Sequence, residues 1–310
     1  MAIVVVGAVF VDIKGFPDDL YLPQGRNAGR VEIVHGGVGR NVAEDIANLE
    51  LRPRFVSMVD DSAEGAAVAK KLADHKVDTK YLLTVPDGMG MWLAVFDETG
   101  DLAGSISKRP VMEPLEKLLE EKGDEIFADA DSIVIEIDID RDVVRQVFRY
   151  AEKYNIPVCA VVANMSIASQ RRDLIRKTSC FVCNEQEAGI LFVRNFEDMS
   201  PETLRGELSE LAAKAGIPAV VVTMGAQGSV YAKMDGSSGF CPARRVSVRD
   251  TTGAGDAFCA GVAAGLTYGK NMDEALEIGT RLAASVITVS ENVCPRFRPA
   301  EFGLITEKQL

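Results

Sequence analysis

The segment DTTGAGDAF, Asp250–Phe258, combines residue types that could transfer a phosphoryl group. Gly253, Ala254 and Gly255 offer almost no side chain, and the small apolar residues after them predict a helix. Glycines at a helix start leave backbone N–H groups open to an anion, and the helix dipole favours negative charge there. Asp256 could accept the proton of an attacking hydroxyl, although a carboxylate at this position is also a common helix cap. One helical turn is thus predicted to hold an anion hole and a general base.

Two further glycine-rich turns accompany this segment. HGGVGRNVAEDIANLE (His35–Glu50) turns into a helix, and VVVTMGAQGSVY places Thr223, Gly225 and Gly228 at the end of a buried strand. Each of them alone is typical of many tight connections. The chain has no GxxxxGK[ST] motif, which excludes a P-loop protein, and no GxGxxG after its first strand, which argues against a nicotinamide site.

Short β-branched runs alternate with segments of helical period along the chain. The runs predicted as strands are Ile3–Val6, Phe55–Val59, Ser132–Ile137, Pro157–Val162, Cys180–Val182, Ala219–Thr223 and Val246–Val248. The predicted helices are Gly39–Leu49, Ala63–His75, Arg141–Tyr154, Gln186–Phe192, Glu202–Ala215, Asp256–Tyr268 and Met272–Val289. This alternation predicts an α/β fold with a mostly parallel sheet covered on both faces, in a single domain over residues 1–310.

One region interrupts the alternation. Residues 90–108 read as a hairpin, with turn residues between two strand-like runs, and residues 9–14 and 31–35 could be further strands. Together, residues 9–35 and 90–108 predict a small β-sheet lid beside the main sheet. Trp92 in this lid could stack on a ligand or simply pack.

Composition narrows the classes of function. The net charge of −12 argues against binding to nucleic acid or to an acidic membrane, both of which favour a basic face. No apolar run approaches the ~18 residues of a membrane span. Six cysteines without a disulfide framework suit reduced thiols in a cytoplasmic protein, and Cys180 and Cys183 are expected to be buried thiols rather than a metal site.

The order of these segments resembles the PfkB, or ribokinase-like, family of carbohydrate and nucleoside kinases. GGVGRNVAEDIANL is similar to its N-terminal signature and DTTGAGDAFCAG to its C-terminal signature; Asn184–Glu187 resembles its NxxE element and Thr223–Gly228 its TxGxxG turn. The resemblance implies a doubly wound αβα sandwich with a β-sheet lid. It also implies transfer of the γ-phosphate of ATP to a hydroxymethyl group of a small sugar or nucleoside.

The resemblance also implies roles for individual residues. Asp256 would be the base, and Gly253, Ala254 and Gly255 would form the anion hole. Asn184 and Glu187 would hold Mg²⁺ and phosphate largely through water, with helix capping as the alternative. The nucleotide would lie along Thr223, Gly225 and Gly228. The acceptor would contact Asp12, Lys14, Gly37 and Asn41, with Asp12 expected at the end of the first strand.

Asp250 and Thr252 resemble members of the family's monovalent-cation loop. The other half of that loop, Ser290–Cys294, lacks the usual glycine, so potassium dependence stays open. Glu136, at the end of a buried strand, could be a carboxylate that serves a metal or the nucleotide. A homodimer through the lid is a further expectation from the family.

The finer resemblance is to pseudouridine kinases, through VDIKG with Lys14, MWLAVFDETGDL and ANMSIASQ. The chain departs from many sugar kinases, because Val162-Ala163-Asn164 stands where they have an acidic motif and Val59 where a glycine is usual. A different nucleoside, a ribokinase- or fructokinase-type sugar acceptor, and a non-catalytic sugar- or nucleoside-binding relative are the alternatives. The presence of Asp256 beside the glycine turn argues against the last of these.

Overall fold

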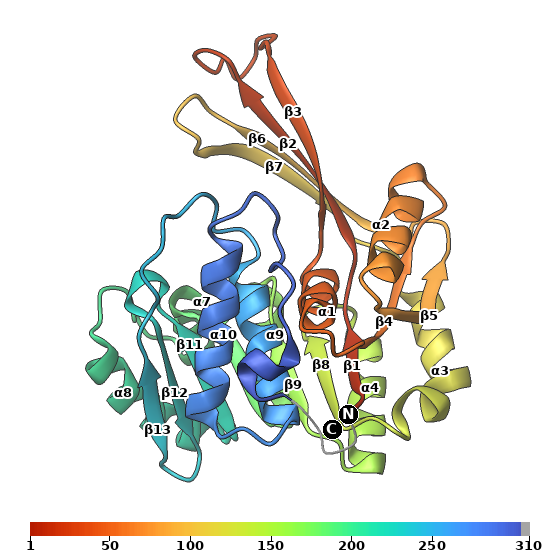
Figure 1. Ribbon diagram of the computed structural model, residues 1–310. Coiled ribbons are helices and arrows are strands. Elements are labelled where there is room, and N and C mark those ends of the chain that lie inside the picture. The colour runs from red at the N-terminus through yellow and green to blue at the C-terminus, as the bar shows by residue number, and fades with distance from the viewer. Residues whose placement is uncertain (305–310) are drawn as a thin grey trace.

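The computed structural model describes residues 1–304, which form a large sheet covered by helices and a smaller sheet that projects from it (Figure 1). In their order across the large sheet, the strands are β13 (Ser238–Cys241), β12 (Ser229–Lys233), β11 (Ala219–Thr223), β10 (Cys180–Asn184), β9 (Val158–Val161), β8 (Ser132–Glu136), β1 (Ile3–Val6), β4 (Arg54–Val59) and β5 (Asp78–Thr84). All neighbours from β11 to β5 are parallel, and β12 and β13 add an antiparallel edge. The expectation of a mostly parallel α/β sheet is confirmed.

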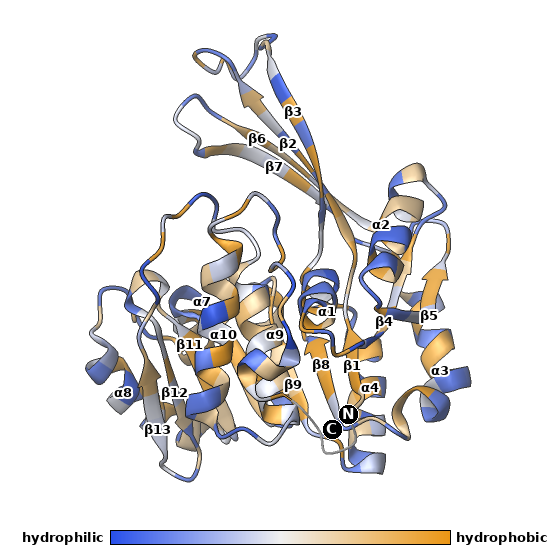
Figure 2. Ribbon diagram, in the orientation of Figure 1, coloured by the Kyte–Doolittle hydropathy of each residue, from blue (hydrophilic) through white to orange (hydrophobic). Residues whose placement is uncertain are grey.

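The strands of this sheet are apolar on both faces because helices cover both (Figure 2). One core layer lies against α1 (Val38–Asn48), α2 (Ala63–Asp74), α9 (Ala254–Thr267) and α10 (Met272–Val286). The other lies against α3 (Glu113–Phe127), α4 (Arg141–Tyr154), α5 (Met165–Ala168), α6 (Arg172–Ile175), α7 (Glu185–Phe192) and α8 (Pro201–Ala215). Short 3₁₀ turns are η1 (Ser169–Arg171), η2 (Gly225–Gln227) and η3 (Pro299–Phe302). The fold is therefore an αβα sandwich.

The smaller sheet is the predicted lid. Its order is β3 (Gly29–Gly36), β2 (Phe10–Pro17), β6 (Gly90–Phe96) and β7 (Leu102–Lys108), so both predicted segments contribute. One expectation was wrong: Asp12 does not lie at the end of the first strand of the main sheet. That strand ends at Val6, and the chain leaves the large sheet there and continues into β2, which carries Asp12 into the lid.

The two faces of the lid differ in chemistry because successive side chains of a strand point to opposite faces. Asp12 pairs with Trp92, which pairs with Ser107, so these side chains share the face that lines a cavity. The opposite face carries the row Ile33–Ile13–Leu93–Ile106 across all the strands of the lid. Ile33, Leu93 and Ile106 are exposed there.

Some boundaries differ from the predictions. Residues 246–248 are not a strand: they pair with nothing in the described part of the chain, and Val246 and Val248 are exposed. The edge strands β5, β12 and β13 were not predicted. Every cysteine is a buried free thiol, as expected for Cys180 and Cys183. Among residues 1–304, no helix combines the length and the apolar character that crossing a bilayer requires.

Candidate active site

The first turn of α9 is built from the glycine segment that the sequence singled out. Gly253 caps the helix with φ of 81°, a left-handed conformation that glycine adopts without cost. A Cβ atom at this position would overlap the backbone of Asn292, so the chain packs too closely there for any other residue. Asp256 follows in the first helical turn, as predicted.

Two cavities meet at this helical turn. The first, here called the lid cavity, has a volume of about 810 Å³ and lies beneath the lid. The second, here called the edge cavity, has a volume of about 530 Å³ and lies toward the antiparallel edge of the large sheet. Gly253 and Asp256 line the lid cavity, whereas Ala254 and Gly255 line the edge cavity. The start of α9 therefore faces two separate spaces, each within the range of ligand pockets.

Asp256 has a specific partner in the lid cavity. The side-chain Nδ2 of Asn41, on α1, donates a hydrogen bond of 2.7 Å to Oδ2 of Asp256. Burial raises the pKa of Asp256 to about 6, while the hydrogen bond from Asn41 and the positive charge of Arg40 act in the opposite direction. Asp256 is therefore largely ionised at neutral pH yet basic enough to accept a proton.

The predicted acceptor residues gather around the same cavity, with one exception. Asp12, Gly37 and Asn41 line it, and burial raises the pKa of Asp12 while the charge of Lys14 lowers it. Lys14 is not among the lining residues. It follows Asp12 on the same face of β2, and its charge also lowers the pKa of Asp250.

Glu136 lies at the end of β8, in the wall of the lid cavity rather than of the edge cavity. Its Oε2 accepts hydrogen bonds from the backbone N–H groups of Ala8 (2.9 Å) and Gly39 (3.1 Å). Burial, followed by the nearby charge of Asp138, raises its pKa. Glu136 thus links the segment after β1 to the start of α1 and forms part of the cavity wall.

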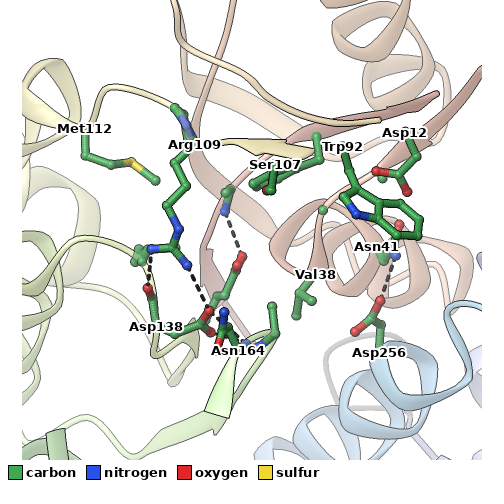
Figure 3. Close-up of a pocket in the computed structure, with 18 of the residues that line it drawn as sticks. Asp12, Val38, Asn41, Trp92, Ser107, Arg109, Met112, Asp138, Asn164 and Asp256 are labelled. Atoms are coloured by element: carbon green, nitrogen blue, oxygen red, sulfur yellow. Dashed lines mark hydrogen bonds and ion pairs between the residues drawn. The ribbon is translucent and has the colours of Figure 1, made fainter. Parts of the chain in front are cut away.

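The far end of the lid cavity holds a group that the sequence did not reveal (Figure 3). The carboxylate of Asp138 accepts backbone N–H bonds from Ala163 (2.8 Å) and Asn164 (3.0 Å). Arg109, which follows the last lid strand, donates to the carbonyl of Asp138 (3.3 Å) and lies 3.6 Å from its Oδ2. Val38 adds an apolar wall between this end and Asp256, and Met112 adds another beside Arg109 (Figure 3). These residues come from segments that are distant in sequence, so no local motif indicates that they form a cluster.

The edge cavity contains the third predicted segment. Thr223 ends β11, and Gly225 and Gly228 follow in the turn, both with positive φ. Apolar side chains of α10, such as Ala283 and Ile287 just after it, form much of the wall. Arg244 and Arg245, which were not predicted, add positive charge to an otherwise apolar space.

Asn184 and Glu187 form a reciprocal cap at the start of α7. The N–H of Glu187 donates to Oδ1 of Asn184, and the N–H of Asn184 donates to Oε2 of Glu187, each at 2.8 Å. Neither residue is among those that line the two cavities. Burial raises the pKa of Glu187, and the charges of Asp138 and Asp256 add to the effect. The structure thus shows the capping alternative and places Glu187 within electrostatic reach of Asp256.

The predicted cation residues also bond to one another. Oδ1 of Asp250 accepts hydrogen bonds from the backbone N–H (2.9 Å) and the hydroxyl (2.8 Å) of Thr252. Asp250 is exposed, and Thr252 contributes to the wall of the lid cavity.

Comparison with known proteins identifies the family of this chain. The family model described as pfkB family carbohydrate kinase matches residues 2–293. The chain belongs to the pfkB family of carbohydrate kinases. The predicted resemblance is confirmed, and with it the class of enzyme.

Curated relatives of this pfkB-family kinase include nucleoside and sugar kinases. A guanosine-inosine kinase of Exiguobacterium acetylicum is 36% identical, over 94% of this chain and 95% of the relative. A pseudouridine kinase of Escherichia coli is 25% identical, over 84% of this chain and 82% of the relative. The finer prediction of a pseudouridine kinase therefore has weaker sequence support than a purine nucleoside kinase.

Solved structures share the fold of this pfkB-family kinase. Arabidopsis thaliana ribokinase, complexed with ribose and ATP, superposes with a TM-score of 0.86 at 23% identity, covering 99% of this chain and 100% of that chain. A Burkholderia thailandensis nucleoside kinase in complex with inosine gives a TM-score of 0.75 at 16% identity, covering 97% of this chain and 96% of the other. The ribokinase-like sandwich with its lid is thus confirmed.

Proposed function

We propose that this kinase uses ATP to phosphorylate the 5′-hydroxyl of a ribonucleoside, with a purine ribonucleoside as its acceptor. The observation that carries the proposal is the placement of two cavities on either side of the first turn of α9. A donor in the edge cavity and an acceptor in the lid cavity would meet at Gly253–Asp256.

The reaction follows from this arrangement. Asp256, held by Asn41, accepts the proton of the 5′-hydroxyl, and the oxygen attacks the γ-phosphorus of ATP. The bond between that phosphorus and the β–γ bridging oxygen breaks, and ADP leaves. The free N–H groups at the start of α9 stabilise the negative charge on the phosphoryl oxygens during transfer. Gly253, Ala254 and Gly255 are proposed to supply these groups.

The shape of the lid cavity supports a nucleoside rather than a free sugar. In our proposal Asp12, Gly37 and Asn41 hold the ribose close to Asp256. The cavity continues beyond them toward Arg109 and Asp138 and would be incompletely filled by a pentose. Trp92 offers an aromatic surface and Val38 an apolar one to a base in that space.

The choice of a purine rests on sequence similarity to the guanosine-inosine kinase, which exceeds that to the pseudouridine kinase. Pseudouridine is the second candidate, supported by the stretches around Lys14 and Asn164–Ser169 that resemble pseudouridine kinases. A pentose or hexose acceptor and a non-catalytic binding protein remain the alternatives that the assay below separates.

Nucleotide binding is proposed for the edge cavity, along Thr223, Gly225 and Gly228. Kinases of ATP require Mg²⁺ to neutralise phosphate charge, and carboxylate oxygens are suitable partners for its water ligands. Glu187 would fit this role because the negative charges of Asp138 and Asp256 act on it, so a cation beside it would be attracted by several carboxylates, although its Oε2 is engaged in the helix cap. Asn184 would then act mainly by fixing the orientation of Glu187.

A monovalent cation is proposed to bind at Asp250 and Thr252. Their oxygens suit K⁺, but they already bond to each other, and the charge of Lys14 acts on the same carboxylate. A rise in kcat when K⁺ replaces tetramethylammonium at constant ionic strength would support the site. Equal kcat values in the two salts would reject it.

The exposed apolar row of the lid supports a homodimer. Ile33, Leu93 and Ile106 would leave water if two lids packed face to face. We also propose a cytoplasmic location, in agreement with six free, buried thiols.

The deciding experiment measures ADP formation with guanosine, inosine, adenosine, pseudouridine, ribose and fructose. We expect the highest kcat/KM with guanosine or inosine. A higher value with ribose or fructose would overturn the nucleoside proposal, and a higher value with pseudouridine would overturn the choice of a purine. Nucleoside binding by calorimetry without any ADP formation would identify a non-catalytic protein.

A further inference from the structure

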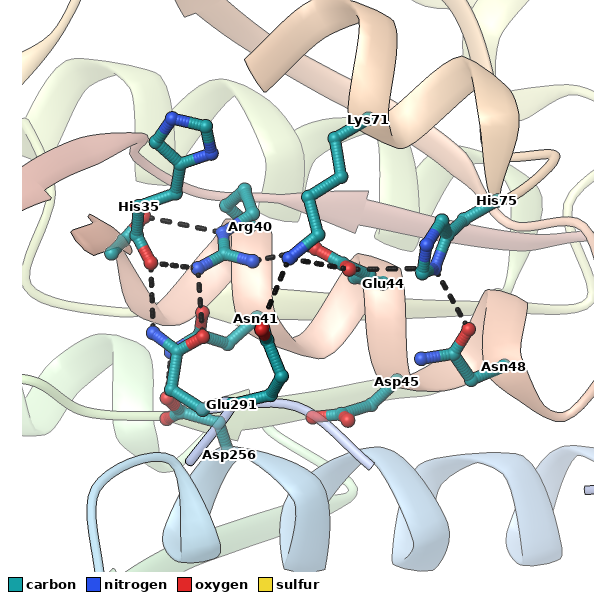
Figure 4. Close-up of polar contacts among 12 residues, drawn as sticks. His35, Arg40, Asn41, Glu44, Asp45, Asn48, Lys71, His75, Asp256 and Glu291 are labelled. Carbon is teal, nitrogen blue, oxygen red and sulfur yellow. Dashed lines mark hydrogen bonds and ion pairs between the residues drawn. The ribbon is translucent and has the colours of Figure 1, made fainter. Parts of the chain in front are cut away.

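A buried ion pair lies next to the proposed active site and has no part in the mechanism described so far (Figure 4). Arg40 and Glu44, both on α1, are 1% and 0% exposed, and Nη1 of Arg40 lies 2.5 Å from Oε2 of Glu44. Removing two charges from water costs about as much as their attraction returns, so a buried pair is weak evidence for stability. The remaining contacts of Arg40 point to another role.

Arg40 binds three separate segments through its guanidinium group. Nε donates to the carbonyl of Gly36 (3.4 Å), and Nη2 donates to the carbonyl of His35; both belong to the end of lid strand β3. Nη2 also donates to Oδ1 of Asn292 (3.2 Å), in the segment after α10. Asn292 in turn donates from Nδ2 to the same His35 carbonyl (2.8 Å). The lid, α1 and the Asn292 segment therefore meet at one side chain.

The Asn292 segment is the support of the anion hole. Gly253 packs so closely against the backbone of Asn292 that a Cβ atom would overlap it. Any displacement of Asn292 must therefore move Gly253 or open a gap behind it. Arg40 is also next to the proposed base in another way, because the following residue of α1, Asn41, donates a hydrogen bond to Asp256.

We propose that Arg40 is a positioning residue for phosphoryl transfer, which fixes the Asn292 segment behind Gly253 and aligns both with Asn41 and the end of lid strand β3. The inference rests on the roles proposed above for Gly253 and Asp256. The positioning role requires the guanidinium group, which is planar and donates several hydrogen bonds at once. A lysine has one point-like cationic nitrogen and cannot satisfy Glu44, the two carbonyls and Asn292 in this spread-out geometry.

The test compares Arg40→Lys and the double variant Arg40→Met/Glu44→Leu with a matched control, Lys71→Met. The double variant removes both buried charges, so neither is left unpaired. Lys71 contacts the same carboxylate, with Nζ 3.3 Å from Oε1 of Glu44, and also pairs with the exposed side chain of Glu291 (3.2 Å), the residue before Asn292, but it has no bond to His35 or Asn292. Because an exposed ion pair contributes little, the control alters the surroundings of Glu44 while every contact of the Arg40 guanidinium is kept.

We expect kcat to fall about ten- to a hundred-fold in both Arg40 variants, as for a misplaced reacting group. The KM for ATP should change by no more than about twofold, because Arg40 does not line the edge cavity. Lys71→Met should keep its wild-type kcat. Folding of each variant is checked by its melting temperature and by ATP binding. Wild-type kcat in a folded double variant, or an equal loss in Lys71→Met, would overturn the proposal.

A pH profile gives a second measurement that a merely structural role would not change. The positive charge of Arg40 lowers the pKa of Asp256, and the other charged groups that act near this site are Asp45 on α1, Glu136 on β8 and Glu187 on α7. The double variant, which loses this positive charge, should have its acid limb of kcat/KM at higher pH, whereas Lys71→Met and the charge-conserving Arg40→Lys should not. An unmoved acid limb in the double variant would contradict the proposal.

The parent proposal is tested separately by Asp256→Asn. If that variant keeps its turnover, the assignment of the base fails, whatever Arg40 does. If Asp256→Asn is inactive and the folded Arg40 variants are fully active, only the positioning role fails.

Discussion

Nδ2 of Asn41 lies 2.7 Å from Oδ2 of Asp256, which joins the two glycine-rich signatures of the chain at one hydrogen bond. Asn41 belongs to α1 and Asp256 to α9, and these helices cover the same face of the large sheet. The bond leaves the second carboxylate oxygen of Asp256 available to a substrate in the lid cavity. The proposed base is therefore oriented before any acceptor binds.

Replacing Asp256 with asparagine should lower kcat by about 10²–10⁴-fold, because the amide cannot accept the proton of the acceptor hydroxyl. ATP binding should persist, since Ala254 and Gly255 rather than Asp256 line the edge cavity. Steady-state assays and calorimetric titration with ATP check the two parts. Near wild-type turnover would remove the proposed mechanism.

Asn41→Ala should shift the pH dependence of kcat/KM. The ionised form of Asp256 is the active base, and its pKa of about 6 predicts that activity falls as the pH drops through that value. The hydrogen bond from Asn41 favours the ionised form, so its loss raises the pKa and moves the acid limb to higher pH. An acid limb that stays in place or moves lower would refute this account of the pKa.

Gly253→Ala should impair both turnover and stability. The residue would have to keep φ of 81° and place its Cβ where the backbone of Asn292 lies. We expect a lower melting temperature and a reduced kcat. The control is Gly255→Ala, because an added Cβ at Gly255 meets nothing within 4 Å and Gly255 has no positive φ. If Gly253→Ala is as stable as Gly255→Ala, the close packing against Asn292 does not matter.

Features that depend on neighbouring residues could be predicted from the sequence, whereas features that depend on contacts between distant segments could not. The start of α9 and the lid hairpin are encoded by neighbouring residues and were predicted, whereas the cap formed by Asn184 and Glu187 was only the alternative to their predicted role in holding Mg²⁺ and phosphate. The predicted position of Asp12 was wrong because Asp12 belongs to a separate strand, β2, which pairs with β3 and β6 of the lid and not with the large sheet. No role was predicted for Arg40, since its partner Asn292 is far away along the chain.

Arg109→Met should weaken binding of the acceptor and leave the rate of phosphoryl transfer largely unchanged. Arg109 lies at the far end of the lid cavity, beside Asp138, where the base of a nucleoside would lie. A lost hydrogen bond from a charged donor predicts about a tenfold or greater rise in the KM for guanosine or inosine. The KM for ATP should be unaffected, and any weak activity on ribose should change little. An equal effect on ribose would place Arg109 outside the base-binding region.

Ile106→Glu should dissociate the proposed dimer. Ile106 is 71% exposed and stands at the end of the apolar row that crosses the lid on the face opposite Asp12 and Trp92. A charge within a contact between two apolar faces would be buried without a partner, which strongly disfavours association. Light scattering coupled to gel filtration should show a dimer for the wild type and a monomer for the variant. The control is Ser105→Glu on the cavity face of the same strand, which should leave the mass unchanged. A monomeric wild-type protein, or a dimer that persists in Ile106→Glu, would show that this face does not join two copies of the chain.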